Sequence, residues 1–280
     1  MLSYQHAYHA GNYADVLKHI TLIQTLKYLK AKGKPVCYID THAGSGDYKL
    51  NSAEAQKNQE FLGGIGNLWQ RDGLPACVAD YVNLIKDFNH SEQLSHYPGS
   101  PLIASQLLGD RDRLFLYELH TAESRLLNDA VKRDKRIKAF RADGLMDSLG
   151  LLPPKENRGL ILIDPSYEVK TEYQTVVDAL KAMHKRFATG CYCLWYPVVA
   201  RKRNQYMERA LQASGIKNIQ LFELGIQLDS DEHGMTASGM IVINPPWTLL
   251  NDMQQVLPWL AETLGENQQG HYRIEQLVRE

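Results

Sequence analysis

Seven short apolar runs recur along the chain, and stretches with helical spacing separate them. The runs lie at 36–40, 114–118, 137–140, 160–164, 191–196, 219–223 and 240–244. Strands that alternate with helices are typical of a doubly wound α/β sheet with helices on both faces. Residues 15–29 place apolar side chains three and four positions apart and end near Gly33 and Pro35, so they predict a helix before the first strand. We therefore expect an α/β fold with a seven-stranded sheet.

The interval between the first two predicted strands is too long for a simple crossover. Two amphipathic stretches in this interval, at 60–69 and 78–88, predict a helical insertion over residues 49–110. Such an insertion could grip a substrate, or it could only cover an edge of the sheet, and the sequence favours neither. No repeat or flexible linker divides the chain, so we expect one domain over residues 1–280 that contains this subdomain.

The composition indicates a soluble globular protein. The chain has 280 residues, of which 44% are hydrophobic and 22% are charged. No apolar stretch is long enough to span a bilayer, and the N-terminus lacks the order of a secretory signal, so we expect a cytoplasmic location. The four cysteines form no Cys-x-x-Cys pair, and we interpret them as reduced core residues.

The formal net charge of −1 argues against a general binder of polyanions, because phosphate affinity rises with the number of cations that displace counterions. A nucleic-acid surface on this chain must therefore be local. Three basic clusters are candidates, at 27–34, 132–138 and 201–203. Each cluster taken alone is more simply interpreted as a solvated helix face.

Polar residues follow each of the first four predicted strands, at the edge where open α/β sheets bind ligands. Gly44 lies in a turn that would let the backbone approach a cofactor, and Glu118 is placed to accept both hydroxyls of a ribose. Asp143 could accept from an adenine amino group, and Gly144 would allow close backbone contact. One acid in such a position is more often a helix N-cap. The ordered set, completed by Asp164, indicates a cofactor that carries a nucleoside.

Asp164, Pro165, Ser166 and Tyr167 end the fourth strand and predict an amino-methyltransferase that acts on adenine or cytosine. An adenine amino group is a poor nucleophile, because its lone pair is delocalised into the ring. The Asp164 carboxylate and the Pro165 carbonyl would accept its two hydrogens and favour a pyramidal nitrogen that faces a methyl donor. Tyr167 would stack on the base.

Residues 244–247, with the sequence Asn-Pro-Pro-Trp, match the amino-methyltransferase pattern more closely than 164–167 do. They follow the last predicted strand, however, after the sheet has turned back on itself. The chemistry belongs beside the cofactor, at the end of the fourth strand. We therefore interpret 244–247 as a strand terminator with a packed tryptophan.

Long stretches of the chain resemble a known family, and they lie at 2–4, 9–12, 14–19, 97–104, 159–165 and 234–240. Together with the glycine turn and the acids after the strands, they resemble the RlmJ family of 23S ribosomal RNA adenine-N6 methyltransferases. The resemblance implies a class I, Rossmann-like methyltransferase sheet with seven strands, helices on both faces and a small helical insertion after the first strand. It also implies S-adenosylmethionine as cofactor and methyl transfer to N6 of an adenine in 23S ribosomal RNA. We expect such an RNA-binding, rRNA-processing enzyme to be a monomer.

The resemblance assigns roles to single residues. The positions that match contacts to S-adenosylmethionine are His19, His42, Ser100, Glu118, Asp143, Gly144 and Asp164. We add Gly44 to the cofactor site because of its turn. Asp164 also matches the catalytic acid, with Pro165 and Tyr167 beside it, and Tyr4 matches a residue that meets the RNA. We place Lys18 and Tyr167 on the RNA side of the site as well.

One residue departs from the family pattern, which is Asp-Pro-Pro-Tyr, because Ser166 takes the place of the second proline. A proline at a compatible position contributes only about 0.4–1 kcal/mol of rigidity. Pro165, whose carbonyl is the expected acceptor, is kept. We therefore expect activity to survive this change.

Three other functions are alternatives to methyl transfer to ribosomal RNA. A DNA adenine methyltransferase would need the same residues, and a non-catalytic protein involved in catabolism of external DNA would tolerate Ser166. A nicotinamide-dependent oxidoreductase is weakened by the missing third glycine of the dinucleotide motif. Four histidines lie in the N-terminal part of the chain, at His6, His9, His19 and His42. They are not accompanied by acids or cysteines at a spacing typical of a metal site. We expect no metal.

Overall fold

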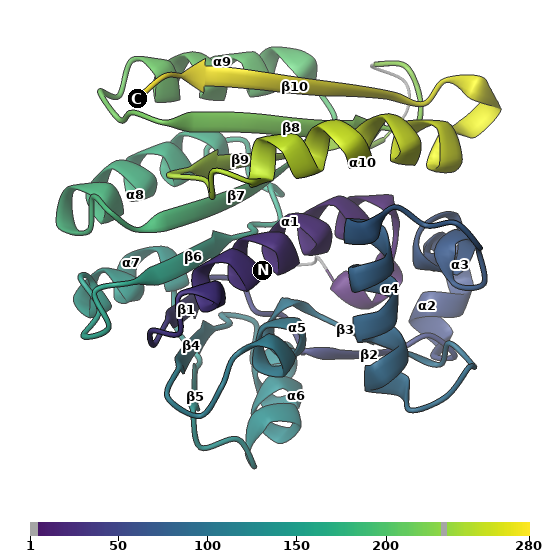
Figure 1. The fold of residues 1–280 in the computed structure, drawn as a ribbon, viewed down its shortest axis with the longest axis horizontal. Helices are drawn as coiled ribbons and strands as arrows, with labels where there is room; N and C mark the ends of the chain where they lie inside the picture. Colours follow the sequence, from purple (N-terminus) through teal and green to yellow (C-terminus); the bar gives the residue numbers. More distant parts are fainter. Residues whose placement is uncertain (1–4, 231–233) are drawn as a thin grey trace.

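The computed structural model describes residues 5–230 and 234–280 and contains an eight-stranded mixed sheet (Figure 1). Five strands run parallel, and they are β1 (Cys37–Asp40), β4 (Arg113–Tyr117), β5 (Ile137–Phe140), β6 (Gly159–Ile163) and β7 (Cys191–Val198). Three strands joined by antiparallel pairing extend the sheet beyond β7, and they are β8 (Ile219–Gly225), β9 (Ala237–Ile243) and β10 (His271–Val278).

The strand order β10-β8-β9-β7-β6-β1-β4-β5 places a topological switch beside β1. From β1 the chain proceeds outward through β4 to β5, and it then returns to the other side of β1 to form β6 and β7. Crossovers that leave in opposite directions open a crevice at the carboxyl ends of the two central strands. The expected ligand edge therefore lies at the carboxyl ends of β1 and β6.

The predicted α/β fold is confirmed, and each of the seven predicted strands is present with its ends shifted by no more than three residues. The predicted number of strands was wrong, because β10 adds an eighth strand at the edge of the main sheet. This strand carries Arg273 and Glu275, and its residues are half-buried or exposed. Polar and apolar side chains are mixed along β10, so no apolar run in the sequence predicts this edge strand.

Two hydrophobic cores lie on opposite faces of the sheet. Along β1 the side chain of Tyr38 belongs to one core, and those of Cys37 and Ile39 belong to the other. This alternation follows from the pleat of a strand, in which successive side chains point to opposite faces. Both faces are therefore covered by helices, as the parallel strands require.

Helix α1 (Tyr13–Ala31) crosses one face of the sheet (Figure 1). The Asn12 side chain caps its N-terminus by accepting from the backbone N–H groups of Ala14 and Asp15. Most of its residues are buried, because the helix packs against the sheet, α4, α5 and α10. Its burial on nearly all sides brings the polar residues of its first two turns into the interior.

The segment between β1 and β4 forms a small antiparallel pair of strands and several helices beside α1 (Figure 1). Its elements are β2 (Asp47–Lys49), α2 (Ala53–Asn58), η2 (Glu60–Gly63), α3 (Ile65–Leu68), α4 (Ala76–Asn89), β3 (His96–Pro98) and α5 (Ser100–Leu107). Helices thus occur at both amphipathic stretches. The division into a domain and an insertion over 49–110 stays a prediction.

One of the remaining helices precedes α1, and the others connect the strands of the main sheet. They are η1 (His6–Tyr8), α6 (Thr121–Val131), α7 (Gly144–Asp147), η3 (Ser148–Leu151), α8 (Glu172–Arg186), α9 (Arg201–Gln212), α10 (Leu249–Leu264) and η4 (Glu266–Gln268). Among the described residues no helix has the length and apolar character needed to cross a membrane. All four cysteines are free thiols, and only Cys77 is partly exposed.

Candidate active site

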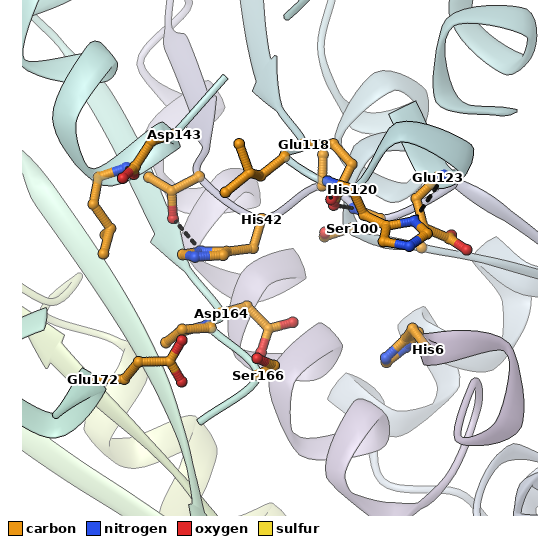
Figure 2. A pocket seen from close by; sticks show the side chains of 18 of the residues that line it. His6, His42, Ser100, Glu118, His120, Glu123, Asp143, Asp164, Ser166 and Glu172 are labelled. Carbon is orange, nitrogen blue, oxygen red and sulfur yellow. Dashed lines mark hydrogen bonds between the residues drawn. The ribbon is translucent and has the colours of Figure 1, made fainter. Parts of the chain in front are cut away.

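A cavity of about 240 Å³ opens at the carboxyl ends of β1, β4, β5 and β6. All eight residues that we expect to bind the cofactor line it, and they are His19, His42, Gly44, Ser100, Glu118, Asp143, Gly144 and Asp164. Figure 2 shows His42, Glu118 and Asp143 along one wall and Asp164, Ser166 and Glu172 along the opposite wall. The side chains that follow four separate strands therefore converge on one space.

The turn after β1 depends on a glycine with a left-handed backbone. Gly44 has a φ of +60°, and a Cβ at this position would lie 2.1 Å from the Tyr48 hydroxyl oxygen. Its backbone N–H donates to Glu118 Oε2 at 2.9 Å, and the His120 N–H donates to Oε1 at 2.7 Å. Burial raises the pKa of Glu118. The turn thus fixes both carboxylate oxygens beside the cavity.

Asp143 caps the short helix α7. Its Oδ1 accepts from the backbone N–H groups of Leu145 at 3.0 Å and Met146 at 3.4 Å. The simpler interpretation of this acid as an N-cap is therefore correct, and the second carboxylate oxygen is the one left for a ligand. A Cβ on Gly144 would lie 2.3 Å from the Thr41 carbonyl oxygen, so this glycine is needed for contact with the turn after β1.

Two polar side chains of the cavity are held by buried neighbours. Ser100 donates its hydroxyl hydrogen to Asp40 Oδ2 at 2.7 Å, which leaves the serine oxygen able to accept from a ligand. Burial raises the pKa of Asp40 to about 6, although hydrogen bonds from Ser100 and Tyr38 oppose this rise. His42 contacts the Thr41 hydroxyl at 2.8 Å, and burial lowers its pKa to about 4. His42 is therefore a neutral ring at physiological pH.

Lys18 joins the cavity to a buried charge network on α1. Its Nζ lies 2.6 Å from Asp164 Oδ2 and 2.8 Å from Asp15 Oδ1. His6 Nε2 lies 3.0 Å from the other oxygen of Asp15. Lys18 and Asp15 are almost completely buried, and the Asp164 side chain is only 14% exposed. The expected catalytic acid is thus already bound to an ammonium group.

The charges of this network stabilise one another. Burial acts against a charged Lys18, but Asp15 and Asp164 offset it and hold the pKa of Lys18 well above its ordinary value. Burial also acts against a charged Asp15, but His6 and Lys18 hold its pKa well below the ordinary value. The sequence analysis placed Lys18 on the RNA side of the site, which stays a prediction, and gave Asp15 and His6 no part in the site. The spacing of Asp15 and Lys18, three residues apart on a helix, was the available signal.

A second cavity, of about 230 Å³, adjoins the first. His6, Lys18, Asp164 and Ser166 line both cavities, so these residues lie between them. The wall of the second cavity that is not shared is rich in rings and includes Tyr167, Tyr173 and Trp195. The second cavity thus adds aromatic rings to charged and polar groups, and Asp164 stands at the junction of the two cavities.

Tyr167 occupies a fixed position in the wall of this second cavity. It is 8% exposed and has a φ of +54°. Its hydroxyl donates to the Trp195 carbonyl oxygen at 2.9 Å, and its ring centre lies 4.5 Å from that of Tyr173. The ring is therefore held by the protein before any base arrives. The prediction that Tyr167 stacks on a base is consistent with this place and stays a prediction.

The Asn-Pro-Pro-Trp motif lies away from both cavities, at the end of β9, which runs antiparallel to β7. The Asn244 side chain donates to the carbonyl oxygens of Ala188 and Gly190 and thereby ends the strand. The packed tryptophan was a wrong expectation, because Trp247 is 80% exposed.

Several basic residues of the three clusters are paired with acids. Lys27 pairs with Asp80, Lys30 with Asp112, Arg136 with Asp134, and Arg201 with both Glu223 and Asp229. Only one of the three basic clusters contributes to the second cavity, through Arg203. The cluster at 201–203 therefore lies at the candidate site, and its contact with a nucleic acid stays a prediction.

Two remaining expectations concern Tyr4 and metal ligands. Tyr4 lies outside the described residues. Within residues 5–230 and 234–280, no group of three histidine, cysteine, aspartate or glutamate side chains is placed to hold a metal ion.

The fold and the site together define a class of protein. A parallel sheet with an antiparallel extension after β7, and a cavity at the carboxyl ends of the strands around the switch point, form a class I methyltransferase fold. Comparison with known proteins indicates the family within this class. A family model described as "Ribosomal RNA large subunit methyltransferase D, RlmJ" matches residues 33–278.

Full-length relatives agree with the family model. A protein of Escherichia coli strain K12 named ribosomal RNA large subunit methyltransferase J is 51% identical over 280 residues, which is all of both chains. A protein of Haemophilus influenzae with the same name is 47% identical over 281 residues, again over the whole of both chains. The solved structure of protein LPL1258 from Legionella pneumophila has 39% identity and a TM-score of 0.88, and the match covers 96% of this chain and 98% of that one. This chain belongs to the RlmJ methyltransferase family.

Proposed function

We propose that this protein transfers a methyl group from S-adenosylmethionine to N6 of an adenine in 23S ribosomal RNA, which is adenine 2030 by resemblance. The observation that carries the proposal is the junction of two cavities at Asp164 and Ser166. One cavity offers polar groups suited to the methyl donor, and the other offers aromatic rings suited to a base. The names of the two full-length relatives support ribosomal RNA as the substrate class.

The first cavity fits S-adenosylmethionine on the chemistry of its side chains. Glu118, held by two backbone N–H groups, keeps further lone pairs for the two ribose hydroxyls. The Asp143 oxygen that is not used by the helix cap can accept from the adenine amino group of the donor. Ser100 and His19 lie where the amino acid end can be held. When bound, this cofactor supplies an electrophilic methyl group on a sulfonium.

The second cavity would receive the target adenine after it leaves its stack. Extracting a base costs a few kcal/mol. Contact with an aromatic ring returns about 1–3 kcal/mol for each base. Tyr167, Tyr173 and Trp195 offer such rings. Arg203 lies in the same wall, where its guanidinium can meet the phosphates that flank an extruded base.

Asp164 and Pro165 would prepare the adenine amino group for reaction. Lys18 occupies Asp164 Oδ2, so Oδ1 is the oxygen available to accept one amino hydrogen, and the Pro165 carbonyl accepts the other. These two bonds favour a pyramidal nitrogen with its lone pair directed at the methyl group. The nitrogen gains a methyl group and gives up one proton, for which the Asp164 carboxylate is the nearest acceptor.

Lys18 has a positioning role in this scheme. Its contacts with Asp15 and Asp164 fix the Asp164 carboxylate at the junction of the two cavities. Because Lys18 also pairs with Asp15, its charge is shared between two carboxylates, and Asp164 can still favour the positive charge that develops on the amino nitrogen during methyl transfer. The network thus orients the acceptor without neutralising it.

Transfer of a labelled methyl group tests the proposal. The wild-type protein should methylate a 23S ribosomal RNA fragment and leave adenine-containing DNA unlabelled, and Asp164→Ala should lose transfer while still binding S-adenosylhomocysteine. Trp247→Phe, in the exposed Asn-Pro-Pro-Trp motif, is the matched control and should keep full transfer. Full transfer by Asp164→Ala would contradict the mechanism.

Cells lacking the gene provide the second test. Mass mapping of their ribosomal RNA should show the loss of one methyladenine, which wild type restores and Asp164→Ala does not. An unchanged map would favour the non-catalytic DNA-handling alternative, and label in DNA would favour a DNA adenine methyltransferase.

A further inference from the structure

Arg203 differs from the other charged side chains of the second cavity because it has no charged partner. The others are paired with one another or with Glu60, and they are His6, His9, Asp15, Lys18 and Asp164. The Arg203 side chain makes no ion pair or hydrogen bond within residues 5–230 and 234–280. Arg201, two positions earlier, is bound to both Glu223 and Asp229. The Arg203 guanidinium is therefore available to an anionic ligand at this cavity.

An exposed tyrosine lies one turn beyond Arg203 on α9. Tyr206 is 53% exposed, and side chains three positions apart are neighbours on the surface of a helix. Its hydroxyl donates to Gln174 Oε1 at 3.0 Å, on the adjacent helix α8 (Figure 1). Tyr173, the residue before Gln174, lines the second cavity. The Tyr206 ring is thus held in place beside the wall that Arg203 and Tyr173 form.

Two further observations connect this surface with the cavity. The positive charge of Arg203 opposes the rise that burial causes in the pKa of Tyr173, so the guanidinium lies close to that ring. Val199, between β7 and α9, lines the same cavity and is exposed. Single exposed apolar side chains are common and need no explanation. Here an apolar residue, an unpaired cation and an exposed ring occur together, and we call Val199, Arg203 and Tyr206 the rim of the second cavity.

The rim has the chemistry of a site for a nucleotide of a single strand. Such sites combine cations that follow the phosphates with rings on which bases stack. A target adenine that enters the second cavity stays joined to its neighbours through phosphates. The base next to it loses its stacking partner when the adenine leaves, so one of its faces is open. Because the strand must leave the cavity over its edge, an adjacent nucleotide is the part of the RNA that meets the rim.

We propose that the rim binds a nucleotide adjacent to the target adenine. Tyr206 stacks on its base, and Arg203 contacts the phosphate that joins it to the target. This inference rests on the proposed function and deepens it, because it names the residues that hold the RNA strand outside the cavity. Stacking accepts any base, so the rim positions the strand and does not select a sequence.

Binding of RNA to variants at Tyr206 tests the stacking contact. The probe is a 23S ribosomal RNA fragment that contains the target adenine, and fluorescence anisotropy measures its Kd. Loss of one stacked ring should weaken binding by Tyr206→Ala roughly 5- to 140-fold. Tyr206→Phe keeps the ring and should bind like the wild type.

Tyr272→Ala is the matched control. Tyr272 lies on the edge strand β10 and is 47% exposed, which is close to the exposure of Tyr206. The next residue, Arg273, contacts Glu208 on α9, so Tyr272 points to the opposite face of the sheet. This variant should keep the wild-type affinity.

Removing the base from the RNA completes the test. Two further fragments carry an abasic residue on the 5′ or the 3′ side of the target adenine. One of the two should bind wild type more weakly than the intact fragment does, and the same change should not weaken binding to Tyr206→Ala. If both abasic fragments lost as much affinity for Tyr206→Ala as for wild type, the proposal would be overturned.

The salt dependence of binding tests the phosphate contact. Arg203→Met should lower the slope of log Kd against log salt concentration by about 0.7–0.9, which is the share of one phosphate contact. Arg209→Met removes an equal charge from the last turn of α9, which lines neither cavity, and should leave the slope unchanged. An unchanged slope for Arg203→Met would overturn the role of Arg203.

Failure of the rim can be separated from failure of the proposed function. If the wild type binds and methylates the fragment, and Tyr206→Ala and Arg203→Met bind it equally well, only the rim is refuted. If the wild type neither binds nor methylates the fragment, the proposed function fails as well.

Discussion

Replacing Lys18 by methionine is the sharpest test of the charge network at the junction of the two cavities. The substitution keeps most of the side-chain volume and removes the ammonium group that lies 2.8 Å from Asp15 and 2.6 Å from Asp164. Two largely buried carboxylates would then lose the cation that they share, and only Asp15 would keep a contact with His6. Removing one partner of a buried ion pair costs about 3–5 kcal/mol. Lys18→Met should lower the free energy of unfolding by that amount.

Lys27 provides a matched control on the same helix. It pairs with Asp80 at 2.5 Å, but both side chains are more than a third exposed to solvent. Pairs of this kind contribute about 0–1 kcal/mol, so Lys27→Met should have little effect. Urea unfolding followed by circular dichroism at neutral pH compares the two variants directly. Adding Asp15→Asn to Lys18→Met should restore part of the loss, because one uncompensated charge is removed.

Acid provides a further check on the same variant. The deficit of Lys18→Met should shrink as the pH is lowered, because protonated carboxyl groups need no cation. Equal and small losses for Lys18→Met and Lys27→Met would refute the reasoning. They would mean that water or a rearranged side chain compensates the two carboxylates.

Gly144→Ala should cost about 1–3 kcal/mol of stability, because its Cβ would lie 2.3 Å from the Thr41 carbonyl oxygen. Gly150→Ala is the control, since its Cβ would meet open space, and it should leave the melting temperature unchanged. His19 has a folded pKa of about 3 against an ordinary value of 6.5, so its contribution to stability is lost as the pH falls through this range. Between pH 7 and pH 5, His19 should lower the free energy of unfolding of the wild type by about 2 kcal/mol. Urea unfolding of His19→Gln should lack this part of the decrease. Tyr167→Phe should lower stability by about 1–3 kcal/mol, since a buried carbonyl loses its donor. It should keep most methyl transfer, because the ring remains, and loss of transfer at unchanged stability would contradict this.

The parallel sheet and the ligand edge could be predicted because both are local patterns. The run 159–163 is apolar at each position and buried on both faces, and Asp164 follows at once. Glu118 follows β4 directly, and Asp143 is the third residue after β5. An apolar run followed by a polar residue therefore predicts both a strand and the position of a ligand-binding group. This prediction needs no knowledge of contacts between residues that are distant in the sequence.

The charge network and the contact between Tyr97 and His19 could not be predicted in this way. Asp15, Lys18 and His19 precede the first strand, so a search of strand ends does not reach them. They enter the site only because α1 is buried on nearly all sides and crosses the sheet beside the switch point. Tyr97 meets His19 across 78 positions of sequence, a contact that no local spacing reveals.

The position of Asp164 at the junction has a consequence for the order of events at the site. Its carboxylate borders both cavities, and one of its oxygens is held by Lys18 while the other is left for the substrate. A positive charge in the first cavity and an amino group in the second would therefore share one anion. Each ligand should strengthen the binding of the other through that carboxylate, and an uncharged thioether in the first cavity should do so less than a sulfonium. Product release would follow from the chemistry, because methyl transfer removes the sulfonium charge that Asp164 helps to hold.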